Sequence, residues 1–369
     1  MIFIRQTKAW LQGITKSLSN FGMRFHILKL GLIVSLQKIF GKLGKVYAPF
    51  NKGGIFRKWY GNCEYVIKFD EENYLKLLNQ GNHLPSRKYY FQKGITWSLF
   101  GFENFGVRFK NDGFVFDVSG SSMFPEEKDL YYIIGYLCSN ICFKFLSCLA
   151  PTVNFQVGNI ASLPFKLTED VALREKIDQL VKENIDICKE EWSFYETSIE
   201  FEACPFIMPK FKEDTLEKSF KKFEKYYHHL RNQLRKNEEE LNKIYSEIFG
   251  VFQEVDCSVN DRDLTLKPFD RKAFMKDFLS YSIGCSVGRY HLKTLKPDYS
   301  QYHYNIKLDN ANEFLKKLLI ELFGKEGLEE NYHYMMQVLN IKSIENYYQK
   351  EFMEYHQKIY QNHPIYFLQ

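Results

Sequence analysis

The first 63 residues of this 369-residue chain contain no aspartate and no glutamate. Eleven lysine and arginine residues fall in that stretch, and the first acidic residue is Glu64. Positive charge without neighbouring acids attracts polyanions, which include the phosphate backbone of nucleic acids and anionic membrane surfaces. The formal net charge is only +5. It is therefore the uneven distribution of charge, and not its total, that indicates a polyanionic partner.

Several motifs that commonly identify enzymes and metal sites are missing. The eight cysteines form no CxxC pair and no Cys/His spacing typical of zinc, and no GxxxxGK[ST] phosphate loop occurs. His228 and His229 are adjacent, so on a helix they point in different directions and cannot easily share one ligand. We therefore expect no catalytic residue, no metal site and no bound cofactor in this chain. The cysteine usage favours a reduced, cytoplasmic compartment.

A long uninterrupted apolar run is also missing. The nearest approach to one is residues 130–149, which Asn140 and Lys144 interrupt. This composition favours a buried helix over a membrane span, so we expect no membrane partner. Residues 1–45 are basic and mildly amphipathic but lack the compact apolar stretch and small-residue cleavage site of a signal peptide, and we leave them unassigned.

The chain nevertheless has enough apolar residues, 45%, to build buried cores. Residues 46–166 predict an α+β unit: a strand at 63–69, a hairpin about the Asp112-Gly113 turn, a helix at 129–149 and an irregular return at 154–164. Residues 251–369 predict an α-helical region. The fold class is therefore α+β, with a small mixed sheet, a long helical spacer and an α-helical C-terminal region.

Residues 167–250 predict the helical spacer. Apolar positions recur there at alternating spacings of four and three, which is a heptad pattern. Its members are Leu216, Phe220, Phe223, Tyr227, Leu230, Leu234, Asn237, Leu241, Ile244 and Ile248. Such a stripe needs an apolar partner surface. A second helix at 171–191 can supply it within the chain, and a coiled-coil homodimer is the alternative.

The segment Lys52-Gly53-Gly54-Ile55-Phe56-Arg57-Lys58-Trp59-Tyr60-Gly61-Asn62 combines the residue types that contact nucleic acids. Arg57 and Lys58 can neutralise phosphates, and Trp59 and Tyr60 offer planar faces. The two adjacent glycines allow close approach to another surface. A basic turn held in place by a buried Trp is the alternative interpretation.

Further candidates lie in three other segments. A basic and aromatic group at 86–90 suits phosphates and bases. The serines that end the 116–122 segment could hold a phosphate or simply turn the chain, and amides at 154–156 suit adenine edges. Solvated loops and framework amides are the alternatives. The full set of DNA-binding candidates is Lys52, Arg57, Lys58, Trp59, Tyr60, Arg87, Lys88, Tyr89, Tyr90, Ser121, Ser122, Asn154 and Gln156.

Motifs that occur in a fixed order carry a family resemblance. They are VYAPFNKGGIFRKWYGN at 46–62, GITWS at 94–98, FDVSGSS at 116–122, PTVNFQVGNIASLP at 151–164 and GCSVGRY at 284–290. In this order and spacing they resemble the C-terminal specificity region of adenine-specific DNA methyltransferases of the BREX (phage-growth-limitation) phage-defence kind, which are akin to fused restriction-modification enzymes. The Asn-Pro-Pro-Tyr motif and the Gly-rich S-adenosylmethionine loop of such enzymes are absent.

The resemblance implies a DNA target-recognition fragment of a site-specific adenine-N6 methyltransferase, with double-stranded DNA as its partner. In the intact enzyme S-adenosylmethionine would be the cofactor. The further partners that the resemblance implies are a separate methyltransferase-domain polypeptide or other defence-system proteins. The ending HPIYFLQ at 363–369 resembles a family segment that normally continues, so we expect a chain truncated at both ends. The alternatives are a helical protein-interaction module of the defence system and an inert remnant of a disrupted gene.

Overall fold

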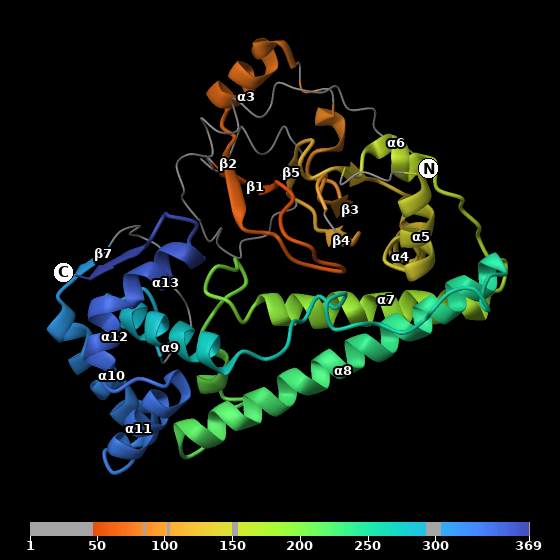
Figure 1. Ribbon diagram of the computed structural model, residues 1–369. Coiled ribbons are helices and arrows are strands. Elements are labelled where there is room, and N and C mark those ends of the chain that lie inside the picture. The colour runs from red at the N-terminus through yellow and green to blue at the C-terminus, as the bar shows by residue number, and fades with distance from the viewer. Residues whose placement is uncertain are drawn as a thin grey trace. The chain divides into compact units, whose positions relative to one another are not determined.

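The chain folds into two compact units, each described here by itself (Figure 1). Of the described residues, those up to Glu190 and those of Arg231–Lys267 form the first unit, and those of Glu191–Leu230 and from Pro268 onward form the second. Helices dominate and the sheets are small, which confirms the α+β class. The basic segment at 1–45 lies outside the described residues. The computed structural model describes residues 47–82, 84, 86–101, 104–149, 154–292 and 304–368.

Strand β1 (Tyr47–Asn51) is the central strand of one three-stranded sheet in the first unit. It pairs antiparallel with β2 (Tyr65–Lys68) and parallel with β5 (Val115–Phe116). Alternate side chains of the β2 segment, Ile67 and Phe69, are buried in an aromatic-rich cluster. This burial agrees with the alternation that the sequence shows, because successive side chains of a strand point to opposite faces.

Strand β3 (Gly94–Trp97) is the central strand of a second three-stranded sheet. It pairs antiparallel with β4 (Val107–Lys110) and with β6 (Ser122–Met123). All four residues of β3 are buried, and the indole Nε1 of Trp97 donates a hydrogen bond to the carbonyl oxygen of Phe155 at 2.9 Å. The GITWS motif is therefore the interior strand of this sheet.

The predicted hairpin about Asp112-Gly113 is wrong in its pairing. The turn exists, and Gly113 adopts φ +85°, which suits a glycine. The strands on either side, β4 and β5, belong to different sheets and do not pair. A tight turn signal fixes where the chain reverses, but sheet membership depends on partners that are distant in sequence.

A short helix α3 (Glu71–Leu77) follows β2, and the Asp70 side chain caps it by accepting a hydrogen bond from the Asn73 amide at 2.9 Å. One π-helical turn, Leu78–Asn82, continues it. Three 3-10 turns lie elsewhere in the described chain, at Arg87–Tyr89, Glu127–Asp129 and Pro205–Ile207.

The single helix predicted at 129–149 is two helices. Helix α4 (Leu130–Leu137) and helix α5 (Asn140–Leu149) meet at an angle of 74°. The Ser139 hydroxyl accepts a hydrogen bond from the Cys142 amide at 3.3 Å, so it caps the second helix. Among the described residues no single helix has the length and apolar character to cross a membrane, and this bent pair passes that test only when its two helices are taken together.

The segment predicted as an irregular return at 154–164 contains one short helix, α6 (Val157–Ala161). The Asn159 side chain accepts a hydrogen bond from the Gln156 amide at 3.0 Å, which satisfies a donor at the start of this helix. Asn154 forms only an isolated bridge with Phe100.

Helix α8 (Leu216–Phe249) is continuous over the predicted heptad pattern, and α7 (Val171–Trp192) precedes it. Of the ten predicted stripe positions all but Ile248 are buried within the chain, as the intramolecular interpretation requires. In the first unit helix α8 packs against α4 as well as α7. The Tyr245 hydroxyl donates a hydrogen bond to the Tyr132 carbonyl at 2.6 Å, and the Asn237 amide donates one to Glu183 at 2.9 Å.

The second unit is mainly helical, as predicted, with a small parallel pair of strands that the sequence did not indicate. Strands β7 (Tyr304–Ile306) and β8 (Tyr366–Leu368) form that pair. Phe223 lies in an aromatic cluster with Phe269 and Phe274, at ring-centroid distances of 5.6 and 5.1 Å. The helices are α9 (Arg271–Ser286), α10 (Leu308–Phe323), α11 (Leu328–Leu339), α12 (Ile344–Lys350) and α13 (Phe352–Ile359).

Candidate nucleic-acid interface

The Lys52–Asn62 segment is a folded loop whose glycines allow close backbone contacts. Gly53 adopts φ +78°, and a Cβ added there would lie 2.5 Å from the carbonyl oxygen of Ser119. The Asp117 carboxylate holds that neighbouring turn by accepting hydrogen bonds from the amides of Ser119 at 2.8 Å and Gly120 at 3.2 Å. The two motifs at 46–62 and 116–122 therefore meet in the first unit, and only glycine fits at this contact.

Lys58 and Trp59 are buried and share one carboxylate, that of Glu238. The Lys58 ammonium lies 2.5 Å from Oε2 of Glu238, and the Trp59 indole donates to Oε1 at 2.7 Å. Burial by itself lowers the pKa of Lys58, but the charge and hydrogen bond of Glu238 outweigh it and hold that pKa above its usual value. In this structure neither side chain is available to DNA.

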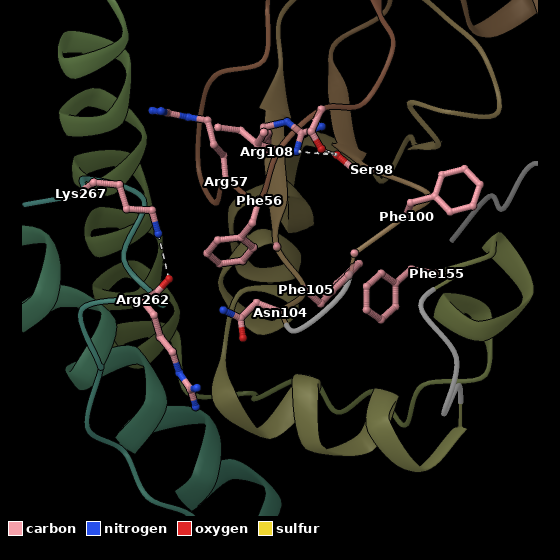
Figure 2. A pocket seen from close by; sticks show the side chains of 14 residues that line it. Phe56, Arg57, Ser98, Phe100, Asn104, Phe105, Arg108, Phe155, Arg262 and Lys267 are labelled. Carbon is pink, nitrogen blue, oxygen red and sulfur yellow. Dashed lines mark hydrogen bonds between the residues drawn. The ribbon is translucent and has the colours of Figure 1, made fainter. Parts of the chain in front are cut away.

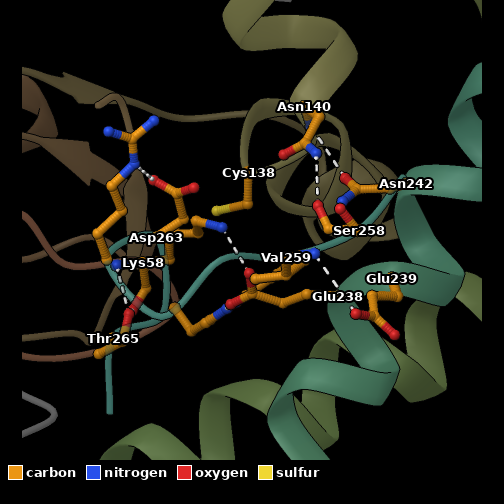
Figure 3. A network of polar contacts seen from close by, with 12 residues as sticks. Lys58, Cys138, Asn140, Glu238, Glu239, Asn242, Ser258, Val259, Asp263 and Thr265 are labelled. Atoms are coloured by element: carbon orange, nitrogen blue, oxygen red, sulfur yellow. Dashed lines mark hydrogen bonds and ion pairs between the residues drawn. The ribbon is translucent and has the colours of Figure 1, made fainter. Parts of the chain in front are cut away.

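The backbone of the same loop is fastened to a strap, residues 255–267, that follows α8. The Thr265 hydroxyl accepts from the Lys58 amide at 2.9 Å and donates to the Lys58 carbonyl at 3.2 Å (Figure 3). At the first residue of α5, the Asn140 side chain donates to the carbonyls of Asp256 and Ser258 at 2.9 and 3.2 Å. The strap thus positions the loop from segments far away in sequence.

Arg57 and Tyr60 are also buried. Arg57 Nε donates a hydrogen bond to the Tyr60 carbonyl at 3.0 Å, and its guanidinium fills the space beside Gly61, where an added Cβ would lie 2.3 Å from Nε. The Tyr60 hydroxyl accepts from the Asn111 side chain at 3.2 Å. Arg57 differs from Lys58 in one respect, because it lines a cavity.

The cavity lies between the 54–57 turn, the 98–108 segment and the strap (Figure 2). Its volume is about 540 Å³, which is in the range of small-ligand sites. Four aromatic rings and four cationic side chains line it, and none of the described lining residues is acidic. The aromatic, cationic and polar residues of the lining are Phe56, Arg57, Ser98, Phe100, Asn104, Phe105, Arg108, Phe155, Arg262 and Lys267.

Arg108 is the most unusual residue of this lining. It is 2% exposed, and in the described part of the chain no carboxylate lies within ion-pair distance of it. NH1 donates to the Ser98 hydroxyl at 3.4 Å, and Nε has no hydrogen-bond partner. Burial is the main cause that lowers the pKa of Arg108 to about 10, and the nearby Arg57 charge contributes to the same shift.

The remaining basic and aromatic candidates separate into exposed and buried groups. Arg87 and Lys88 are exposed, and the Lys88 ammonium lies 4.9 Å from the Tyr89 ring centroid. Tyr89 is half-buried and stacks on Phe124, whereas Tyr90 is buried. Only the two cations are placed to reach a phosphate without any rearrangement.

The small polar candidates are mostly internal. Ser121 and Ser122 are buried, and their hydroxyls donate to the carbonyls of Val118 and Gly120, both at 3.1 Å. Lys52 is half-buried and lies 5.2 Å from the ring centroid of Tyr65.

The two predicted base-reading amides differ in exposure. Gln156 is exposed at the start of α6. Asn154 is half-buried, and its side-chain oxygen is buried without a hydrogen-bond partner.

Sequence reasoning missed Arg108, Phe100, Arg262 and Lys267. Phe100 is 53% exposed, which is uncommon for an aromatic side chain. Phe100 is the second residue after the GITWS motif, in the apolar pair Leu99-Phe100, whereas Arg108 has the sequence context of an ordinary residue of strand β4. No local pattern shows that Arg108 is buried without a counter-ion, because that property depends on the neighbours that the fold supplies.

The GCSVGRY motif has a structural role in the second unit. Its letters 284–288 spell GxSxG, yet they end helix α9 instead of joining a strand to a helix, and the Ser286 hydroxyl donates to the Ile283 carbonyl. Tyr290 and Tyr366 both donate hydrogen bonds to Oε1 of Glu196, at 2.9 and 2.7 Å. The described residues contain no cluster of His, Cys, Asp or Glu suited to a metal.

No protein-family model matches the chain. Two curated proteins are similar to it over most of its length. The chain is 28% identical over 365 residues to "Adenine-specific methyltransferase PglX" of Lacticaseibacillus casei (strain Zhang), a match that covers 87% of this chain and 30% of that protein. It is 26% identical over 391 residues to "Adenine-specific methyltransferase BrxX" of Escherichia coli O9:H4 (strain HS), covering 89% and 31%.

The fold defines a small α+β unit with a concavity that cationic and aromatic side chains line. The sequence matches are more specific. They confirm that this chain is related to BREX-type adenine-specific methyltransferases. It spans less than a third of the length of these curated relatives.

Proposed function

We propose that this chain is the DNA target-recognition part of a site-specific adenine-N6 methyltransferase of a phage-defence system, and that its first unit contacts double-stranded DNA. The observation that supports this most is the cationic cavity of the first unit, which lies where the motifs at 46–62 and 94–98 come together. The names of both relatives support an adenine-specific methyltransferase as the larger context. The thiols of all eight cysteines are free, in keeping with a cytoplasmic location.

The cavity does not suit S-adenosylmethionine. That cofactor carries a positively charged sulfonium, whereas the described lining of this cavity has Arg57, Arg108, Arg262 and Lys267 and no acid. We therefore assign methyl transfer to a separate methyltransferase-domain polypeptide or to further protein outside this chain, and derive no catalytic step for the residues described here.

Exposed cations of the first unit carry the non-specific part of the proposed binding. Arg87 and Lys88 lie on a solvent-facing turn, and Lys267 lies at the cavity. Cations that neutralise phosphates release counter-ions, so the logarithm of affinity falls with the logarithm of salt concentration by about 0.9 for each phosphate.

The test is fluorescence anisotropy of a labelled duplex titrated with the full chain at several salt concentrations. Changing both Arg87 and Lys88 to Ala weakens binding to all sequences and flattens the salt slope by roughly two. The matched control changes Lys317 and Lys325, two exposed lysines of the second unit, to Ala and leaves the slope unchanged. A folded chain that shows no duplex binding, or a slope that both double variants share, contradicts the proposal.

A second candidate function has one observation in its favour. The α7 face that carries Glu175, Asp178, Glu183, Asp186 and Glu190 lines a shallow groove of about 670 Å³. Such an acidic face repels DNA and suits a basic protein surface. A helical interaction module would use this groove, and changing Glu175 and Asp186 to Gln would then reduce binding of a partner protein without altering the binding of DNA.

A further inference from the structure

Beyond general DNA contact, and resting on the proposed function, we propose that the Arg108 cavity holds one unstacked nucleotide of the bound duplex. The Arg108 guanidinium takes its phosphate, and the aromatic walls take its base. This site is separate from the pocket in which the catalytic part of a methyltransferase would hold the adenine to be methylated.

Arg108 has no counter-ion among the residues that the structure describes. A buried guanidinium is normally paired with a carboxylate, because removing a charge from water is unfavourable without such compensation. The Arg108 side chain is 2% exposed and donates only one long hydrogen bond, to Ser98, while its Nε has no partner. An anion bound in the cavity would supply the compensation that the described protein does not.

The side chains around Arg108 are also positively charged. Arg57 lies close enough to disfavour the charge of Arg108, and the exposed Lys267 and Arg262 complete the cationic rim. The Lys267 ammonium donates to the Arg262 carbonyl at 2.9 Å and lies 5.6 Å from the Phe56 ring centroid (Figure 2). Like charges close together repel one another, and a bound phosphate relieves that repulsion, so it binds more favourably there.

Aromatic side chains form a wall of the cavity. Phe105 and Phe155 pack together at a centroid distance of 4.8 Å and form one wall, with the exposed Phe100 beside them. Gly101 permits this packing, because a Cβ there would lie 2.7 Å from the Phe155 ring. Aromatic faces bind single bases by stacking, and each such contact contributes to affinity for any base.

The shape of the cavity also favours a single nucleotide. The site is a concavity of about 540 Å³, which suits a single ligand of nucleotide size, whereas an intact duplex is read by protruding elements that enter its grooves. The Ser98 hydroxyl and the Asn104 amide are polar groups of the lining that can hydrogen-bond to a base edge. Extrusion of a base from the duplex is unfavourable, and least so where the base is already mispaired.

The test compares the affinity of the full chain for two duplexes that differ only by one central mismatched pair. The mismatched duplex binds on the order of tenfold more tightly, because part of the extrusion cost is removed. Phe100→Ala and Arg108→Gln bring this ratio close to one. Phe252→Ala, which removes an aromatic side chain that is 41% exposed and does not line the cavity, keeps it.

Folding and ligand source are checked in the same samples. Because Arg108 is an uncompensated buried charge, Arg108→Gln leaves the melting temperature unchanged or raises it, whereas a structural arginine would lower it. Equal affinity for the two duplexes, or a ratio unaffected by Phe100→Ala, overturns the nucleotide site while leaving duplex binding intact. Deoxyadenosine monophosphate that binds as tightly as the mismatched duplex also overturns it, in favour of a free nucleotide. Failure to bind either duplex overturns the proposed function itself.

Discussion

The Lys58 ammonium and the Glu238 carboxylate lie 2.5 Å apart although 180 residues separate them in the sequence. Their side chains are 5% and 2% exposed. This ion pair attaches the 52–62 loop to helix α8, and Trp59 donates to the same carboxylate. It therefore holds in place the loop that forms one side of the cavity.

Removing one member of this pair should destabilise the first unit strongly. Lys58→Met leaves the Glu238 carboxylate buried without its partner, which costs roughly 3–5 kcal/mol. Lys58→Met combined with Glu238→Leu removes both charges, and the double variant should be more stable than the single one. Urea denaturation of the two variants and the parent checks this order. Equal stabilities for the single variant and the parent would show that the pair is not formed.

Lys110 should give the first unit a characteristic dependence on pH. Burial lowers the pKa of its ammonium to about 7 from 10.5, and Asp112 opposes this only weakly. Between these values the unfolded chain binds a proton that the folded chain does not, so stability rises from about pH 7 to pH 10. The rise should be on the order of 3–5 kcal/mol.

Urea denaturation at intervals between pH 7 and pH 10 measures this dependence of stability on pH. Lys110→Met should flatten the rise, because it removes the titrating ammonium, which donates to the Gln92 carbonyl and lies over the rings of Phe116 and Phe124. Parallel pH curves for parent and variant would contradict the lowered pKa.

Gly284 should not tolerate even an alanine. A Cβ there would lie 2.5 Å from the Tyr290 ring and 2.5 Å from the Tyr366 hydroxyl. Gly284→Ala therefore displaces two donors of the Glu196 network and destabilises the second unit by about 1–3 kcal/mol or more. Gly288→Ala is an informative comparison, since no atom lies within 4 Å of its added Cβ and only its φ of +76° causes strain. Thermal melts that are unchanged for Gly284→Ala would contradict the close contact.

The elements of the fold that depend on local patterns could be predicted from the sequence. The heptad spacing predicts α8, and the alternation at 63–69 predicts β2. The strands that β4 and β5 each pair with could not be predicted, because β4 and β5 belong to different sheets and their partners are distant in sequence. The break between α4 and α5 depends on a single serine cap that propensity alone does not reveal.

The candidate site shows the same division. Composition correctly singles out the 52–62 loop as a place where charge and aromatic rings meet, yet it cannot tell an exposed cation from a buried one. Lys58 is buried because Glu238, contributed by a helix far along the chain, is there to pair with it. Arg108 is buried and has no such partner in the described part of the chain. The contrast between two cations of one unit follows from tertiary packing alone, and it is this contrast that identifies the cavity.

The most direct test of the central claim is photo-crosslinking of the full chain to a duplex that contains photoreactive bases, followed by peptide mapping. If the first unit contacts DNA, the crosslinked peptides come from the cavity rim around Phe100 and from the turn at Arg87 and Lys88, and the yield falls as salt is raised. Crosslinks confined to the second unit, or a folded chain that gives none at low salt, would contradict the account.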